Sequence, residues 1–376
     1  MRSPRLPTLV EPILRKSSST GLQIDSLDGL RGVAILFVLL GHMGNAGIHL
    51  TPLFSLARFD ICGVLLFFVL SSFLLTLPPV KRQKSQFLEL SVWSIYARRR
   101  FLRIFPLFFL VLLVSHIFST HLNVPYFVPI SRSEFVNHLL LREGKNIFWA
   151  IPVEVKYYVL LPFVAFLFCV PLKKNPLAAA LFVVAASILI RFVLWPPWRP
   201  EEFEVSRISL ARNLPVFLMG SLTALLQSRI FKPKRLKPLY ARGLLNLVAI
   251  MAFLTIVLLI PRFWTSVSGQ EFRWSLTYVH SAVFGFLWAF FLFLCLSGAG
   301  LVSRVLGSTP LRFMGVVSYS AYLWHLPVMC FIQAKVDAHP SVKVLLIIII
   351  VLVVSTISHV LVEKPFMKLG LPNRRS

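Results

Sequence analysis

The sequence predicts an all-α integral membrane protein with about ten transmembrane helices and both termini in the cytoplasm. Hydrophobic residues make up 57% of the 376 residues, charged residues only 14%, and the mean hydropathy is +0.79. No water-soluble domain hides that much apolar surface in one core. The apolar runs reach the roughly 20 residues that a helix needs to cross a bilayer. They also lack the alternation of apolar and polar residues that is typical of barrel strands.

Ten apolar runs are separated by breaks that are rich in proline or charge. The first run is too long for the core of a signal peptide and lacks a small-x-small cleavage site, so we expect an uncleaved anchor. In chain order the predicted spans cover residues 28–48, 59–78, 103–119, 147–170, 176–195, 211–228, 243–261, 277–297, 314–334 and 343–362.

The distribution of basic residues orients these spans. With the N-terminus in the cytoplasm, 26 of the 39 lysines and arginines fall on the inner side, as the positive-inside rule requires. Most of the formal charge of +25 is then explained by the orientation of the spans in the membrane, which argues against a nucleic-acid partner. Basic loops would also attract anionic membrane lipids. We expect a polar tail over residues 1–26, a membrane domain over 27–363 and a basic tail over 364–376.

The first predicted span carries an arginine and a histidine on one face. Arg31 and His42 are eleven residues apart, which is nearly three helical turns and about 16 Å along the axis. Ionisable groups in a span are costly and mark candidate functional sites. Arg31 alone would be read as a topology anchor and His42 alone as a packing side chain. A histidine also suits proton transfer near neutral pH.

Further candidates lie in the fourth and ninth spans. Glu154 and Tyr158 are four residues apart and share a helical face, and an ion pair that fixes helix packing is the alternative role for Glu154. His325 precedes Pro327, whose missing N–H loosens the helix, although a kink with a packing histidine explains it equally. Two histidines and one carboxylate suit a metal, but without an H-E-x-x-H pair we expect none.

Arginines at the entry of the third span are candidates for phosphate binding. Arg100 and Arg103 are neighbours on one helical face, and guanidinium groups bind phosphate in a bidentate manner. A positive-inside cluster is the rival interpretation. Glu363, at the end of the last span, is a candidate partner for one of these arginines or else belongs to a solvated helix end. The four cysteines show no C-x-x-C pairing and are expected to be small buried residues.

Six motifs, in order and over nearly the whole chain, resemble those of the integral membrane acyltransferase family 3. They are "LDGLRG" followed by His42, "GVLLFFVLSSFLL" at 63–75, "RFLRIFP" at 100–106, "IPVEVKYYVLLP" at 151–162, "YSAYLWHLPV" at 319–328 and a terminal "EKPF". Ser72 replaces the usual glycine of the second motif, and Ala150 with Ile151 replaces a common Ser-Leu pair. Some members of that family also carry an extracytoplasmic hydrolase-like domain; we expect none after the last span here, so that the membrane domain alone or a partner would handle the acceptor.

The resemblance implies a membrane O-acyltransferase of the cell inner membrane. It would move an acyl group, most often acetyl, from cytosolic acyl-CoA to a hydroxyl of a surface polysaccharide or a lipid-linked glycan. Arg100 and Arg103 would then hold the phosphates of the donor and Arg31 would orient it. His42 would act as general base or acyl carrier, Glu154 would fix the imidazole tautomer or bind the acceptor, and Tyr158 and His325 would support them.

Two rival functions stay open at the level of the sequence. A proton-coupled transporter or flippase of an anionic or lipid-linked solute would use His42, Glu154 and His325 as a proton relay. A catalytically silent scaffold would need none of these residues. The acceptor, the acyl chain and the oligomeric state are not defined by the sequence.

Overall fold

The structure, a computed structural model, describes residues 21–48, 55–82, 89–122, 124–194, 206–229, 243–270, 277–296 and 300–370. These residues form helices joined by turns, and none of them lies in a strand. Most of the predicted N-terminal tail, the segment "WPPWRPEEFEV" and the last six residues lie outside the described part.

The long helices follow the predicted spans, with differences at their ends. Their bounds are α1 Gly21–Asn45, α2 Phe59–Lys81, α3 Leu90–Thr120, α5 Ala150–Cys169, α6 Pro176–Leu194, α7 Leu210–Arg229, α9 Leu244–Leu258, α11 Thr277–Cys295, α14 Ser318–Lys335 and α15 Pro340–Ser358. Shorter elements connect or extend them: α4 Arg132–Leu139, η2 Asn146–Trp149, α10 Pro261–Ser268, α12 Leu301–Leu306, α13 Thr309–Val316, the π-helix η3 His359–Glu363 and α16 Lys364–Leu369.

Two of the predicted spans are bent pairs of helices. The α9–α10 pair turns by 87° and the α13–α14 pair by 79°. In the described residues six helices are long and apolar enough to cross a membrane, or up to eight if each bent pair is one span. The protein is therefore a helical multi-pass membrane protein, while the count of ten spans and the cytoplasmic position of the termini stay predictions.

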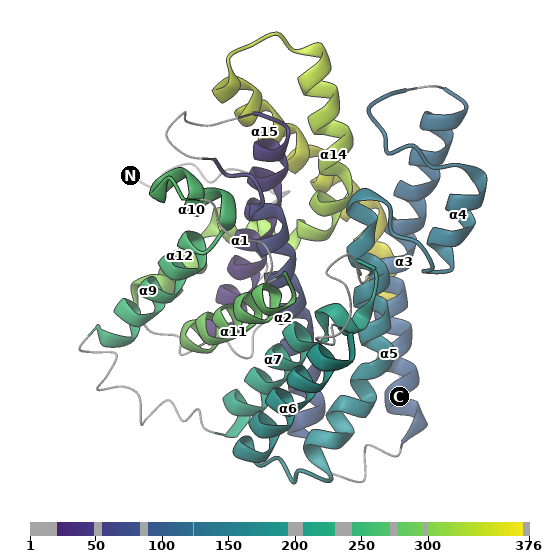
Figure 1. The fold of residues 1–376 in the computed structure, drawn as a ribbon. Coiled ribbons are helices and arrows are strands. Elements are labelled where there is room, and N and C mark those ends of the chain that lie inside the picture. The colour runs from purple at the N-terminus through teal and green to yellow at the C-terminus, as the bar shows by residue number, and fades with distance from the viewer. Residues whose placement is uncertain are drawn as a thin grey trace, which may run out of the picture.

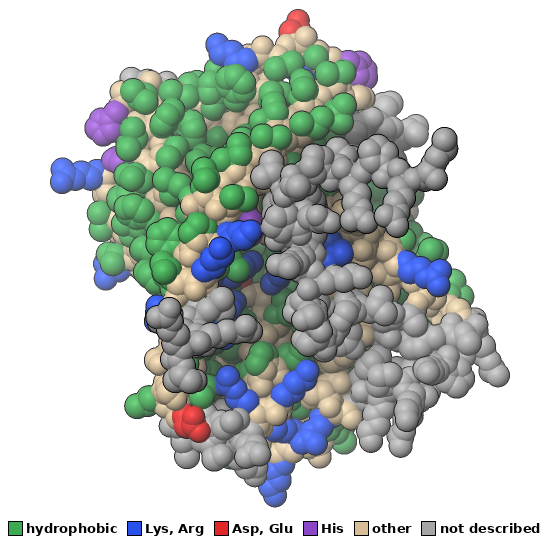
Figure 2. All heavy atoms as spheres, turned by 180° about the vertical axis from the view of Figure 1, so that it is seen from behind, with side chains coloured by type: hydrophobic (Ala, Val, Ile, Leu, Met, Phe, Trp, Pro, Cys, Tyr) green, Lys and Arg blue, Asp and Glu red, His purple; other side chains and the backbone are tan. Residues whose placement is uncertain are grey.

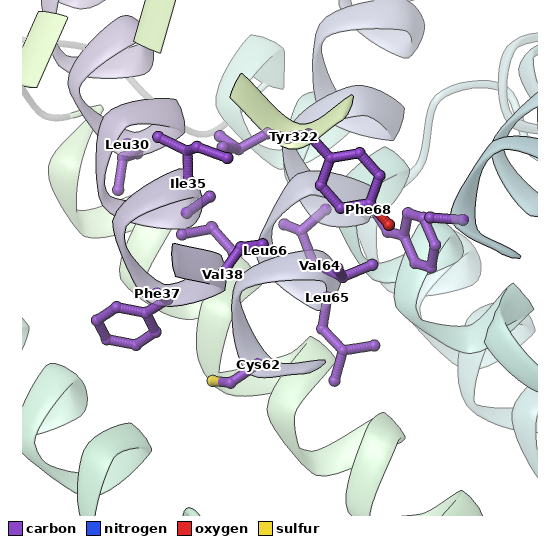
Figure 3. Close-up of a cluster of buried hydrophobic side chains, with 14 of the residues drawn as sticks. Leu30, Ile35, Phe37, Val38, Cys62, Val64, Leu65, Leu66, Phe68 and Tyr322 are labelled. Atoms are coloured by element: carbon purple, nitrogen blue, oxygen red, sulfur yellow. The ribbon is translucent and has the colours of Figure 1, made fainter. Parts of the chain in front are cut away.

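Helix α1 lies at the centre of the molecule and packs against α2, α12, α13 and α14 (Figure 1). Its glycines make this possible. A Cβ on Gly29 would overlap the backbone carbonyl of Leu306, and one on Gly41 would overlap the backbone nitrogen of Asp60. Small residues let helix backbones approach closely in membranes. Side chains from α1 and α2 fill the space between them, with Tyr322 of α14 beside them (Figure 3).

Helix α14 is tied to its neighbours by the polar side chains of the "YSAYLWH" motif. The Tyr319 hydroxyl donates to the carbonyl of Ile104 on α3 at 2.7 Å, and the Tyr322 hydroxyl to that of Ile147 on η2 at 2.6 Å. Trp324 Nε1 donates to Ser358 Oγ on α15 at 3.1 Å. A buried polar group in a membrane must find an internal partner. The motif therefore fixes α14 against three elements.

The surface separates apolar from basic regions. On the face shown in Figure 2, hydrophobic side chains gather in the upper left part, and lysines and arginines are more frequent in the lower part. Of the four free cysteines, Cys62, Cys169 and Cys295 are buried as expected, and Cys330 is partly exposed.

Candidate active site

A cavity near the N-terminal half of α1, here called the Arg31 cavity, collects most of the predicted donor-site residues. It has a volume of about 90 Å³ and is lined by residues of α1, α2, α3, α5 and α14. Five predicted site residues line it: Arg31, Arg100, Arg103, Glu154 and Tyr158. The helices thus bring together groups that are more than 120 residues apart in the chain.

The arginines of this cavity differ in what they contact. Arg31 Nη1 lies 3.3 Å from Asp28 Oδ1, one turn earlier in α1. Arg103 Nη1 lies 3.3 Å from Met367 Sδ. Arg100 Nε is buried and has no hydrogen-bond partner. An unsatisfied buried donor is costly and needs an explanation. An anion in the cavity would provide the missing acceptor.

Two other arginines of the same run serve the fold. Arg98 Nη2 donates to the carbonyl of Leu369 at 2.7 Å, and Arg99 Nε donates to that of Gly370 at 3.2 Å. These carbonyls end α16, where helices leave acceptors without partners. Within "ARRRFLR", the structure therefore divides the arginines between a helix cap and a cavity.

Glu154 sits in a hydrogen-bonded cluster in the Arg31 cavity. The hydroxyls of Ser71 and Tyr158 both donate to Glu154 Oε1 at 2.6 Å, and these two hydroxyl oxygens are 3.4 Å apart. Ser71 belongs to the "LSSFL" stretch, and the sequence reasoning did not select it. The expected i, i+4 pairing of Glu154 with Tyr158 is present, whereas the alternative ion pair of Glu154 with an arginine is not among the ion pairs of the described residues.

His42 lies at the other end of α1, away from this cluster. Its Nδ1 is 3.0 Å from the carbonyl oxygen of Val38, and its Nε2 is 3.9 Å from Asp60 Oδ2. Because a carbonyl only accepts, Nδ1 carries the proton and Nε2 of the neutral ring has a free lone pair. Asp60 also accepts a hydrogen bond from Asn45 Nδ2 at 3.1 Å. Glu154 was expected to fix this tautomer, but Val38 fixes it instead.

His325 of α14 packs directly on His42. The ring centroids are 4.7 Å apart in an edge-on arrangement. His325 Nδ1 lies 2.7 Å from the carbonyl of Tyr322, and its Nε2 is buried without a hydrogen-bond partner. The structure thus brings two of the predicted catalytic residues together, and both rings have Nδ1 tied to their own helix.

A second cavity, here called the His42 cavity, opens at this end. It has a volume of about 510 Å³ and lies between the C-terminal end of α1, the start of α2, η2, the start of α7, the start of α10 and part of α11. Its polar lining residues are His42, Asn45, Arg58, Asp60, Asn146, Arg207, Arg212, Asn213 and Ser281. Trp149 adds an aromatic side chain.

A thin layer of side chains separates the two cavities. Along α2, Val64 lines the Arg31 cavity and Leu65 lines the His42 cavity. Where η2 meets α5, Ile151 lines the Arg31 cavity and Trp149 lines the His42 cavity. Tyr322 lines the Arg31 cavity, and its hydroxyl donates to the carbonyl of Ile147, which lines the other. The seven predicted site residues therefore form two groups around this layer.

Glu363 has different partners from those expected. It is 1% exposed, which excludes a solvated helix end, and no ion pair joins it to an arginine within the described residues. It accepts from Ser320 Oγ, and its Oε2 lies 3.3 Å from His359 Nδ1. Nor do His42, His325 and Glu154 converge, and the described residues hold no group of three His, Cys, Asp or Glu side chains that could bind a metal ion.

Comparison with known proteins gives one family. A family model described as an acyltransferase domain matches residues 24–360. The chain is 26% identical over 93% of its length to the peptidoglycan O-acetyltransferase OatA of Listeria monocytogenes, and 24% identical over 94% of its length to the O-acetyltransferase OatA of a Staphylococcus aureus strain. It spans 57% and 60% of the lengths of these two relatives. No solved structure matches.

Proposed function

Because the chain belongs to the acyltransferase domain family, we propose that it is an O-acyltransferase of the cell inner membrane that modifies a glycan. The acyl group, acetyl first of all, would come from cytosolic acyl-CoA and go to a hydroxyl of a surface polysaccharide or a lipid-linked sugar. One observation carries the proposal: an arginine-lined cavity and a cavity lined by His42 lie on either side of one layer of side chains, with Arg31 and His42 about 16 Å apart along α1.

The Arg31 cavity suits the anionic donor. Arg31, Arg100 and Arg103 line it, against the single carboxylate of Glu154 among its described lining residues. Guanidinium groups form strong charge-assisted hydrogen bonds with phosphate, and Arg100 Nε has an unused donor. We assign Arg100 and Arg103 to the phosphates of CoA and Arg31 to the deeper part of the donor. Ser71, Tyr158 and Glu154 would contact its amide-bearing arm.

The tautomer of His42 suits a general base. Nε2 would take the proton from the acceptor hydroxyl while its oxygen attacks the thioester carbonyl. The C–S bond then breaks, and the CoA thiolate leaves with the proton that His42 received. Asp60, 3.9 Å from Nε2, would stabilise the imidazolium that forms during this step. His325 packs against His42 and would limit how the ring can rotate.

The donor's thioester must pass the layer that divides the cavities. Tyr322 lies in this layer and reaches both sides, since its ring lies 5.9 Å from that of His325, between centroids, and its hydroxyl is bonded to Ile147. We therefore place the thioester beside Tyr322 at the moment of transfer. Arg100, Arg103 and Tyr322 line the same cavity, so the arm of a donor held at these arginines would extend toward Tyr322.

The test uses membranes that contain the full chain, labelled acetyl-CoA and a panel of oligosaccharides. Labelled, base-labile glycan is expected with the wild type. His42→Ala should lower transfer at least about 100-fold, because it removes the base. Gel filtration in detergent checks that the variant folds. Wild-type rates for a folded His42→Ala variant would refute the assignment, and pH-driven solute flux without any acyl transfer would favour the transporter instead.

A further inference from the structure

Among the described residues that line the His42 cavity, basic side chains outnumber acidic ones. Three arginines, Arg58, Arg207 and Arg212, line it together with His42, and Asp60 is the carboxylate among its described lining residues. Asp60 is already engaged by Asn45 and lies beside His42. The composition of the Arg31 cavity is accounted for by an anionic donor, whereas nothing in the proposed reaction yet accounts for these three arginines.

Resting on the proposed function, we propose that the His42 cavity selects an anionic acceptor, a sugar that carries a carboxylate or a phosphate. The arginines come from two separate elements. Arg58 immediately precedes α2. Arg207 lies just before α7, and Arg212 lies in the first turn of α7. An oxyanion held by these arginines would lie in the same cavity that His42 lines.

The geometry around Arg58 supports a binding role. Arg58 has a φ of 74°, in the left-handed region that non-glycine residues rarely adopt, and its backbone N–H donates to Asn45 Oδ1 at 3.1 Å. Such conformations persist only where surrounding contacts enforce them, and they are frequent at functional sites. Asn45 thus connects Asp60 and Arg58, which links the position of the proposed base to that of a proposed anion ligand.

The remaining lining fits the neutral part of a saccharide. Asn146 and Asn213 carry amide groups that both donate and accept, and Ser281 carries a hydroxyl. The indole of Trp149 offers an apolar face of the kind on which sugar rings stack. A pocket with a few polar groups around an aromatic wall is the usual form of a small-molecule site. The arginines would therefore choose the charged sugar, and the amides would orient it.

The experiment compares three matched acceptors: a neutral β-1,4-glucose tetrasaccharide, the same tetrasaccharide with one unit oxidised to a carboxylate, and the same with one 6-phosphate. Purified full-length protein in vesicles is expected to prefer both charged forms. In Arg207→Gln/Arg212→Gln the KM for charged acceptors should rise about tenfold or more while kcat and the KM for acetyl-CoA stay within twofold. Arg207→Lys/Arg212→Lys should restore part of the preference, and the exposed Arg132→Gln is the matched control.

Acceptor binding is measured separately, by Trp fluorescence without donor. This measurement distinguishes a failure of the anionic acceptor site from a failure of the proposed acyl transfer. Equal transfer to neutral and charged tetrasaccharides, or an unchanged KM in the double Gln variant, would overturn the anionic acceptor and leave acyl transfer standing. Charged-sugar binding that is lost in the double Gln variant, with no transfer to any acceptor, would keep the anion site and refute the reaction.

Anionic phospholipid is the other source of an oxyanion for these arginines. The comparison is therefore run in phosphatidylglycerol and in phosphatidylcholine vesicles. A preference for charged sugars in both supports the acceptor site. The proposal would be overturned if charged sugars were preferred in neither kind of vesicle while activity depended on phosphatidylglycerol and on Arg207 and Arg212. That result would assign the arginines to lipid headgroups.

Discussion

His42 owes its chemistry to two neighbours that lie on either side of its ring. Val38 is one turn earlier in α1, and its carbonyl holds the Nδ1 proton, which leaves Nε2 as the free base. Asp60 comes from α2 and lies on the Nε2 side. The backbone of one helix thus sets the tautomer, while a carboxylate from another helix sits where positive charge would develop.

Replacing Asp60 by Asn should lower kcat for acyl transfer by about 10- to 100-fold, because the imidazolium loses a nearby negative charge. The KM for acetyl-CoA should change little, since Asp60 does not line the Arg31 cavity. Steady-state kinetics with purified protein separate the two constants. Asn45→Ala, which removes the hydrogen bond that positions Asp60, should lower kcat less than Asp60→Asn does; the reverse order would contradict this role.

The arginines of "ARRRFLR" should separate by function. Arg100→Gln/Arg103→Gln is expected to raise the KM for acetyl-CoA about tenfold or more, because both arginines line the Arg31 cavity. Arg98→Gln/Arg99→Gln removes the same charge but only uncaps α16, so it should lower the thermal midpoint and leave the KM unchanged. Equal effects of the two double variants on KM would mean that net charge alone attracts the donor.

Some of these residues could be predicted from the sequence and others could not. Arg31, His42 and His325 are rare ionisable groups in apolar runs, which made them visible. Asp60 lies at the first turn of a span, where an acidic residue is ordinary, and Ser71 is one of many serines in apolar helices. Their importance depends on which helix lies opposite, and helical spacing within one span holds no information about that.

At the scale of the helix, α1 depends on its glycines. Gly41 immediately precedes His42 and lies against the backbone nitrogen of Asp60, so the close approach of α1 and α2 is what brings Asp60 near the histidine. The sequence pointed to Arg31 through "LDGLRG" and to His42, and gave Gly41 no role. The sequence of one helix does not reveal which of its glycines meets the backbone of another helix.

Gly41→Ala should therefore reduce both stability and activity. The new Cβ would overlap the backbone of Asp60, which cannot move without shifting α2, and such overpacking costs about 1–3 kcal/mol. A lower thermal midpoint and a lower transfer rate are expected. Gly370→Ala is the matched control, since its Cβ would meet Arg99 Cγ and Met367 O at an ordinary 3.4 Å. A Gly41 variant as stable and active as this control would contradict the packing role.

Helix α4 contains a pH-sensitive cap outside the spans. Glu134 accepts from the backbone N–H of Ser131 and from Lys145 Nζ, each at 2.7 Å, and these hydrogen bonds lower the pKa of Glu134 from 4.5 to about 2. Because the folded pKa lies below the unfolded one, ionised Glu134 stabilises α4 above pH 4.5, and this contribution is lost as the pH falls toward 2.

Hydrogen exchange measures this directly. Corrected for the intrinsic pH dependence of exchange, amides of residues 131–145 should lose protection between pH 4.5 and about 2, while those of α1 should not. Glu134→Gln should lower protection of the segment at pH 6 and abolish its change below pH 4.5. A wild-type pattern in that variant would show that the carboxylate does not hold the cap.

For the whole molecule, hydropathy predicted the positions of the helices in the sequence better than their bends and their extensions. Each predicted span coincides with a helix or a helix pair, because burial of the backbone in hydrocarbon requires helices. The bends at Leu259–Ile260 and Val317, and the extension of α3 back to Leu90, were not predicted. They depend on contacts with other helices, such as the caps that Arg98 and Arg99 form on α16.

The layer around Tyr322 has a consequence for the energetics of the cell. Two wet cavities that open at opposite ends of α1 would form a pore if they joined, and a pore short-circuits the electrochemical gradient that a plasma membrane maintains. The hydrogen bond from Tyr322 to Ile147 and the side chains of Val64, Leu65 and Ile151 keep the two cavities apart. The proposed transfer would then carry an acyl group past this layer without opening a pore to ions.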